Sequence, residues 1–216
     1  MNILIFLGPA GSGKGTQAQY LKAQFNFAHI STGDLLRAEV KSDSDLGKKV
    51  QAVMKSGNLV SDEIIIEIIK DHVTALTQQT HLKGIVFDGF PRTLAQGKAF
   101  DSMLNSLDLR LNKAMYFDLS LAESIKRISG RQIDSRNNNV YHKDSNPAPA
   151  DAEAYLISRN DDQPEKVKHR YDVYQKETEP LISHYNNHLV RIDCNQSIDD
   201  INAIFNGLIQ SFQVSA

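Results

Sequence analysis

The segment GPAGSGKGT at residues 8–16 decides the fold of this chain. The apolar run ILIFL at residues 3–7 precedes it and predicts a buried parallel strand, because no polar residue alternates with the apolar ones. Residues 17–25 follow without proline or glycine and predict a helix. A glycine-rich turn between a strand and a helix N-terminus is typical of a phosphate-binding loop, because its N–H groups converge on an anion. Lys14 adds a mobile cation for the β- and γ-phosphates.

The loop departs from the usual pattern at one position. Gly15 stands where Ser or Thr usually follows the lysine, and Thr16 comes one residue later. A direct bond from a hydroxyl to Mg²⁺ is therefore less expected than a metal held through waters. Asp88 ends the apolar run of residues 85–88, and an acid at the carboxyl end of a buried strand is well placed to hold such waters. The alternative is a plain turn aspartate.

Composition narrows the class of protein. The chain has 216 residues, 41% of them hydrophobic, and a net charge of −2, so no overall basic field favours nucleic acid or an anionic membrane. The single cysteine, Cys194, leaves no disulfide framework and no cysteine-rich zinc site. We expect a cytoplasmic enzyme without a signal peptide or membrane span. His184 and His188 have the spacing of a metal pair, but no third ligand is suggested, and an exposed helix end is the favoured interpretation.

Further apolar runs and capping residues alternate along the chain. Short strands are predicted at residues 28–30, 85–88, 115–119 and 189–193. Helices are predicted from near Asp34, over 62–76, over 121–129, from Pro164 past a kink at Pro180, and from Ile198, with Ser31, Ser61 and Ser120 as N-terminal caps. Five short strands alternating with helices predict an α/β fold with a doubly wound parallel five-stranded sheet.

Two segments interrupt this alternation. Residues 31–60 suggest short helices broken near 42–45, between two strands. Residues 130–162 contain few apolar residues and many turn formers, which predicts a surface insertion. Arginines gather in and around the second segment, and clamps for phosphate are favoured over a merely solvated face for several of them. They are Arg127, Arg131, Arg136, Arg159 and Arg170.

Six stretches in order resemble the adenylate kinase family. They are GPAGSGKGTQA from Gly8, ISTGDLLR from Ile30, FDGFPRT from Phe87, KRISGR from Lys126, VYH from Val140 and SRNDD from Ser158. The Gly15–Thr16 ending, unusual for other phosphate loops, is the one found in this family. The resemblance implies Mg²⁺-dependent, reversible phosphoryl transfer from ATP to AMP, giving two ADP without a covalent enzyme intermediate.

The resemblance also implies roles for individual residues. The ATP site would comprise Gly11, Ser12, Gly13, Lys14, Gly15, Thr16, Arg127, Arg131, Val140, Tyr141 and Gln196. The AMP site would comprise Thr32, Gly33, Arg37, Asn58, Leu59, Val60, Gly89, Phe90, Pro91, Arg92, Gln96, Arg159 and Arg170. The catalytic set would be Lys14, Asp88, Arg92, Arg131, Arg159 and Arg170, with Mg²⁺ held only through waters near Asp88 and Thr16. Gln96 suits adenine, because its amide offers both a donor and an acceptor.

The same resemblance implies a division of the chain into a core and two insertions, and two alternative functions stay open. The core would be residues 1–30, 61–129 and 163–216, with an AMP-binding insertion at 31–60 and a long-lid-like segment at 130–162. Since that segment lacks cysteine, no structural zinc is expected, and a monomer without nucleic-acid or membrane partners is predicted. The alternatives are a kinase of the same fold for UMP or CMP, and a nucleotide-binding regulator without catalysis.

Overall fold

A central five-stranded sheet organises the computed structural model, which describes residues 1–41, 47–48, 50–51, 61–137, 139–144, 146–158 and 162–214. All neighbouring strands are parallel, and their order is β2-β3-β1-β4-β8. The strands are β1 (Asn2–Leu7), β2 (Phe27–Ser31), β3 (Gly84–Asp88), β4 (Leu111–Asp118) and β8 (Leu189–Asp193). The predicted doubly wound parallel sheet is therefore confirmed, and β4 begins four residues earlier than expected.

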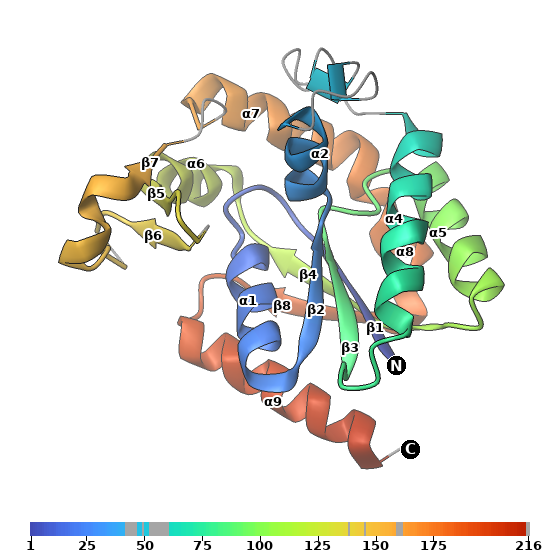
Figure 1. The fold of residues 1–216 in the computed structure, drawn as a ribbon. Coiled ribbons are helices and arrows are strands. Elements are labelled where there is room, and N and C mark those ends of the chain that lie inside the picture. The colour runs from blue at the N-terminus through green and yellow to red at the C-terminus, as the bar shows by residue number, and fades with distance from the viewer. Residues whose placement is uncertain are drawn as a thin grey trace.

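Helices cover both faces of this sheet (Figure 1). They are α1 (Lys14–Phe25), α2 (Thr32–Lys41), α4 (Asp62–Thr77), α5 (Leu94–Ser106), α6 (Leu121–Ser129), α7 (Pro164–Val173), α8 (Pro180–His184) and α9 (Ile198–Val214). Because side chains alternate along a strand, β1 feeds two cores. Ile3 and Ile5 pack with residues of α4, α5 and α8, whereas Leu4 and Phe6 pack with residues of α1 and α9.

The predicted caps differ in how they act. Ser120 accepts the Glu123 N–H at 3.3 Å and caps α6 as expected. Ser31 accepts the Asp34 N–H at 3.3 Å, and α2 accordingly begins at Thr32, two residues before the predicted start. Ser61 occupies the N-cap position of α4, but its side chain makes no capping hydrogen bond.

The kink expected at Pro180 takes the form of a π-helical segment, Tyr174–Thr178, between α7 and α8. The Glu179 N–H donates to Tyr174 O at 3.0 Å, a bond that spans five residues instead of four. Proline lacks an N–H and its ring crowds the preceding turn, so the helix widens just before Pro180. The wider turn leaves Thr178 buried, where its hydroxyl donates to Arg92 O at 2.7 Å.

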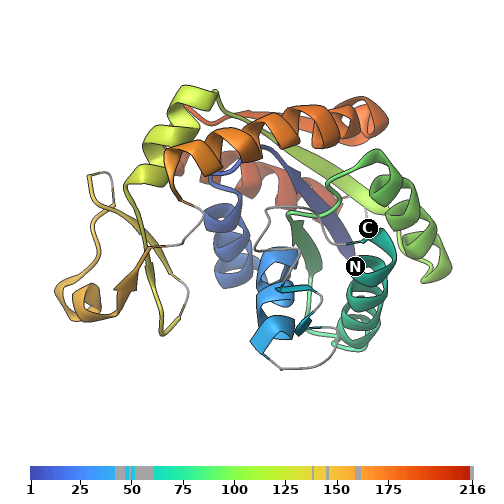
Figure 2. The same cartoon turned by 90° about the horizontal axis from the view of Figure 1, so that it is seen from above.

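A small antiparallel sheet lies within residues 130–162, in order β6-β5-β7. Its strands are β5 (Arg131–Asp134), β6 (Val140–His142) and β7 (Leu156–Ile157), and a 3-10 helix, Ala150–Tyr155, precedes β7. Figure 2 shows this sheet standing apart from the five-stranded one, beyond the end of α6. Asp134 is fully buried in it and binds the guanidinium of Arg136 through both carboxylate oxygens.

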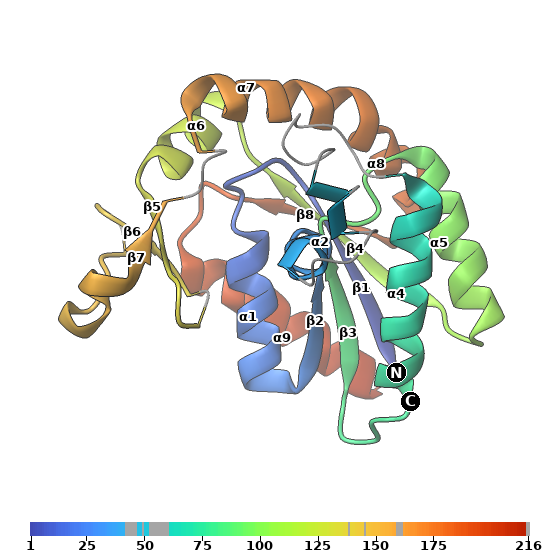
Figure 3. The same ribbon diagram turned by 45° about the horizontal axis from the view of Figure 1, so that its top comes forward.

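The carboxyl ends of the parallel strands come forward in Figure 3, where α2 lies in front of the end of β2 and α1 lies beside it. The loops after β1 and β3 emerge at this edge, which is where parallel α/β sheets bind ligands. Among the residues described, no helix has the length and apolar character needed to cross a bilayer.

Candidate active site

The glycine-rich loop after β1 opens toward the N-terminus of α1. Gly8 has a φ of 145°, and a Cβ added to it would lie 2.5 Å from Phe117 O, so a larger residue would push the loop off β4. Gly13 caps α1 in the left-handed conformation, with a φ of 92°, and a Cβ added to it would meet nothing within 4 Å. The position where a side chain of Gly13 would lie is therefore open, which leaves room beside the N-terminus of α1 for an anion.

Lys14 folds back over this loop. Its Nζ donates to Gly8 O at 2.9 Å, to Pro9 O at 2.7 Å and to Ser12 Oγ at 3.2 Å. Burial lowers the pKa of Lys14 from 10.5 to about 8, although the charge of Asp88 acts in the opposite direction. The charges of Arg92, in the loop after β3, and of Arg170, on α7, lower this pKa further.

Asp88 lies at the carboxyl end of β3, beside the loop. Burial alone would raise the pKa of its carboxyl, but the neighbouring His29 and the charges of Lys14 and Arg92 outweigh burial, and the pKa is lowered. His29 Nε2 lies 3.7 Å from Asp88 Oδ2. A Cβ added to Gly15 would lie 3.6 Å from the same oxygen, so the missing side chain leaves that face of the carboxylate accessible from the loop.

This arrangement fits Mg²⁺ held through waters. An ionised carboxylate and the exposed Thr16 hydroxyl are hard oxygen groups of the kind that Mg²⁺ and its waters prefer. The described residues contain no group of three or more His, Cys, Asp or Glu side chains that could hold a metal ion. His184 instead pairs with Asp101 at 2.8 Å, and His188 lies beyond the end of α8.

Two of the predicted clamp arginines meet at one carboxylate. Arg131, at the start of β5, binds both oxygens of Asp162 through Nε and Nη2, the Nε bond measuring 3.1 Å. Arg170 Nη2, on α7, lies 4.0 Å from Asp162 Oδ1. The Asp162 side chain is only 9% exposed. The third predicted clamp, Arg159, lies outside the described residues.

The residues expected near the ATP base come from α6, from the turn after β8 and from the small sheet. Arg127, on α6, donates from Nη2 to Cys194 O at 2.6 Å, which brings it to the turn that holds Gln196. Gln196 is exposed. Val140 and Tyr141 lie in β6 of the small sheet, where Val140 is 41% exposed.

The expected AMP residues gather between α2, β3 and α5. The Thr32 hydroxyl donates to Gly89 O at 2.9 Å, and Arg92 Nε donates to the same carbonyl at 2.7 Å. Phe90 is fully buried with its ring centroid 5.7 Å from that of Phe100, so its side chain belongs to the core. The side chain of Arg37 and all of residues 58–60, namely Asn58, Leu59 and Val60, lie outside the described part.

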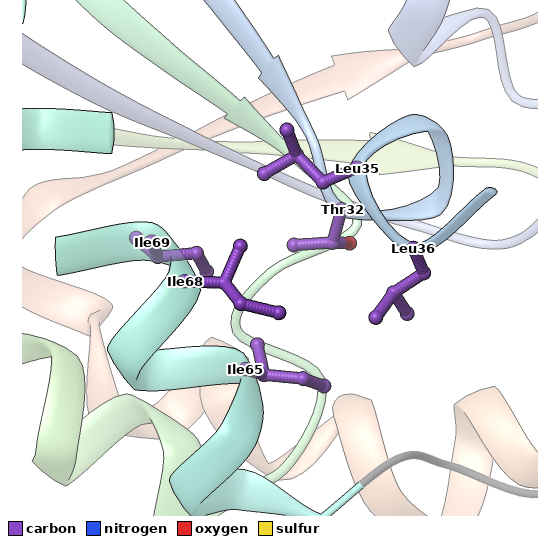
Figure 4. Close-up of a pocket in the computed structure, with 6 residues that line it drawn as sticks. All are labelled: Thr32, Leu35, Leu36, Ile65, Ile68 and Ile69. Carbon is purple, nitrogen blue, oxygen red and sulfur yellow. The ribbon is translucent and has the colours of Figure 1, made fainter. Parts of the chain in front are cut away.

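An apolar pocket adjoins Thr32 (Figure 4). Leu35 and Leu36 of α2 face Ile65 of α4 across it, and Ile68 and Ile69 complete its lining. These side chains offer an apolar surface next to the polar groups at Thr32.

Some contacts in this region have no sequence motif. Ser124, on α6, is fully buried and its hydroxyl donates to Ala10 O at 2.6 Å, which ties α6 to the glycine-rich loop. Asp162 likewise binds Arg131, and Asp62 accepts a hydrogen bond from the Gln96 side chain, each from a distant part of the chain. The amphipathic pattern of α6 could have indicated Ser124 as an inward-facing polar residue, but not its partner.

Comparison with known proteins places this geometry in context. Residues 6–190 match the model of a family described as adenylate kinase. An adenylate kinase of Hydrogenobaculum sp. (strain Y04AAS1) is 47% identical over 188 residues, covering 85% of this chain and 87% of the relative. One of Petrotoga mobilis is 38% identical over 216 residues, covering 97% and 98%, and one of Methanocella arvoryzae is 39% identical over 206 residues, covering 92% and 94%. The similarity therefore extends over nearly the whole length of these relatives.

Proposed function

The chain belongs to the adenylate kinase family, and from this premise we propose that it moves the γ-phosphoryl group of ATP directly onto AMP. The AMP phosphate oxygen is already anionic, so the attack on phosphorus needs neither a general base nor a covalent enzyme intermediate. The protein's task is then to hold the two nucleotides in line, to neutralise charge and to exclude water.

One observation carries the proposal: the charges of Arg92 and Arg170 both act on Lys14, the lysine that follows the glycine-rich loop. The two arginines disfavour the charged form of Lys14, and a group of high negative charge bound beside them would offset that effect. A phosphoryl group in transfer spreads negative charge over its equatorial oxygens and meets this requirement.

We assign the remaining roles on the same basis. The loop residues 11–16 would bind the ATP phosphates, and Arg131 would exchange Asp162 for a phosphate oxygen. Thr32, Arg92 and Gln96 would hold AMP, with its base against the pocket between α2 and α4. The roles of Arg37, Arg159 and residues 58–60, of the lid at 130–162 and of the insertion at 31–60 stay predictions, as do a monomeric state and a cytoplasmic location.

Magnesium, held through waters by Asp88 and Thr16, would neutralise phosphate charge and orient the oxygens. The lowered pKa of Asp88 keeps its carboxylate ionised for this purpose at neutral pH. Lys14 and the arginines supply the rest of the positive charge.

The test is phosphoryl transfer from ATP to a panel of nucleoside monophosphates. We expect a strong preference for AMP and a requirement for Mg²⁺, so that EDTA abolishes turnover. The purified protein should contain no stoichiometric zinc. With ATP made chiral at the γ-phosphorus by oxygen isotopes and sulfur, a single in-line step inverts the configuration, whereas a covalent intermediate retains it. Comparable turnover of UMP or CMP would favour the rival kinase, and binding without turnover would favour the regulator.

A further inference from the structure

The N-terminus of α5 holds a glutamine that is completely buried. Thr93 caps the helix by accepting the Gln96 N–H at 3.1 Å, and the Gln96 side chain turns back so that Oε1 accepts the Arg92 N–H at 2.7 Å. The other end of the carboxamide, Nε2, donates to Oδ1 of Asp62 at 2.7 Å. Asp62 is the first residue of α4, so this bond joins the N-termini of two helices.

These two partners are of opposite kinds, and together they fix which end of the carboxamide is which. A backbone N–H can only donate, so the oxygen must face Arg92, and a carboxylate oxygen accepts, so the nitrogen must face Asp62. A carboxamide has two N–H donors and two acceptor lone pairs. After these two bonds, the carboxamide keeps the capacity to donate one further hydrogen bond from Nε2 and to accept one at Oε1.

From this geometry we infer that Asp62 is a positioning residue for base selection, acting through Gln96; the inference rests on the proposed use of AMP. The adenine edge presents a donor at the N6 amino group and an acceptor at N1, which match the remaining lone pair and N–H. A 6-oxopurine presents the reverse pattern, an acceptor at O6 and a donor at N1. To pair with a 6-oxopurine, the Gln96 carboxamide would have to flip by 180°, and Asp62 opposes that flip because it needs the N–H donor facing it.

The position of Asp62 agrees with this role. Ile65 follows it by one helical turn on the same face of α4 and lines the pocket beside Thr32 and Leu36 (Figure 4). A carboxylate at the first position of a helix is also favoured by the helix dipole, so α4 helps to hold the acceptor in place. Gln96 is thus held from the helix that borders the proposed base pocket.

The experiment measures kcat/KM for AMP and for IMP, which differs from AMP in the donor and acceptor pattern of this edge. We expect Asp62→Ala to lower the AMP-to-IMP ratio about tenfold or more, because a buried amide loses its charged partner. Asp62→Asn keeps an oxygen acceptor and should restore the ratio to within about threefold of the wild type. Glu63→Ala is the matched control, because Glu63 is the exposed carboxylate beside Asp62 in the same helical turn.

A double-mutant cycle with Gln96→Ala shows whether Asp62 acts through Gln96. In that background, Asp62→Ala should change the ratio little. An unchanged AMP-to-IMP ratio in Asp62→Ala overturns the inference. So does an equal drop in that ratio when Asp62→Ala is made in the Gln96→Ala background. If Asp62→Ala does not fold, the ¹⁵N–¹H signals of the Gln96 side-chain amide in Asp62→Asn serve instead: they should move, and unmoved signals contradict the bond. Failure of the wild type to use AMP would refute the proposed function instead, independently of every variant.

Discussion

The lowered pKa of Lys14 predicts that nucleotide binding takes up a proton in mildly alkaline solution. In the free protein the pKa of Lys14 is lowered to about 8, chiefly because the group is partly buried. A bound polyphosphate places several negative charges beside Nζ and should raise this pKa well above 9. The free protein then lacks the Lys14 proton in roughly half of the molecules at pH 8 and in about nine-tenths at pH 9, while the complex holds it.

The magnitude follows from linkage between proton and nucleotide. Uptake should be about 0.1 proton per nucleotide at pH 7, about 0.5 at pH 8 and about 0.9 at pH 9. The dissociation constant should rise about tenfold from pH 7 to pH 9, since only the protonated lysine binds well. The other groups whose charges act on Lys14 do not interfere: the pKa of Asp88 is lowered, that of the Cys194 thiol is raised to about 11, and Arg92 and Arg170 stay charged.

The assay is calorimetric titration with ATP in EDTA, at each pH in two buffers of different ionisation enthalpy. Lys14→Arg is the control that keeps a cation which does not titrate, and it should show neither proton uptake nor the loss of affinity. Lys14→Met should bind weakly with no uptake. Proton uptake by these variants equal to that of the wild type, or none in the wild type, would refute the reasoning.

Two further predictions concern the contacts that hold the loop and the small sheet. Ser124→Ala leaves Ala10 O without its buried donor and should raise KM for ATP several-fold. Ser120→Ala is the control: it removes only the exposed cap of the same helix and should lower stability by about 1 kcal/mol with kcat unchanged. Equal effects of the two variants on KM would contradict a role of Ser124 in holding the loop. Arg136→Leu leaves the buried Asp134 carboxylate without its main partner. Hydrogen exchange should therefore rise across β5, β6 and β7, and KM for ATP should increase on the order of tenfold. KM for AMP and the thermal midpoint of the core should stay near those of the control variant Lys143→Met, which changes an exposed residue. A uniform rise in exchange over the whole chain would show that the effect is not local.

The elements that the sequence predicts well are those whose signal is local. Strands β1 and β3 contain the uninterrupted apolar runs ILIFL and IVF, and Ser120 caps α6 through a residue three positions away. Helix α5 was not predicted, and Gly97 in its interior lowers helix propensity. The structure explains that glycine, because a Cβ there would lie 2.7 Å from Leu181 Cδ2 of α8. The strands of the small sheet are two to four residues long, too short for a periodic pattern.

The predicted site residues were found through their charge and motif, but their partners were not, because those contacts cross long stretches of chain. Arg131 meets Asp162, and Gln96 meets Asp62, across 31 and 34 residues. No spacing rule connects such pairs, since only the fold brings α4 beside α5 or β5 beside Asp162, two residues before α7. Asp162 and Asp62 therefore became visible as contributors only in three dimensions.

These partners also determine how the free site is prepared for substrate. Lys14 donates to two loop carbonyls, Arg92 donates to Gly89 O, and Arg131 binds the single negative charge of Asp162. Each cation is therefore held in place before a nucleotide arrives, which reduces the entropy lost on binding. The partners are neutral carbonyls or a carboxylate of charge minus one, whereas a nucleotide phosphate carries more charge and more acceptor oxygens. Exchange of an internal partner for a nucleotide phosphate is therefore favourable. The affinity is set by the difference in free energy between the new contact and the internal contact that it replaces, not by the full strength of the new contact.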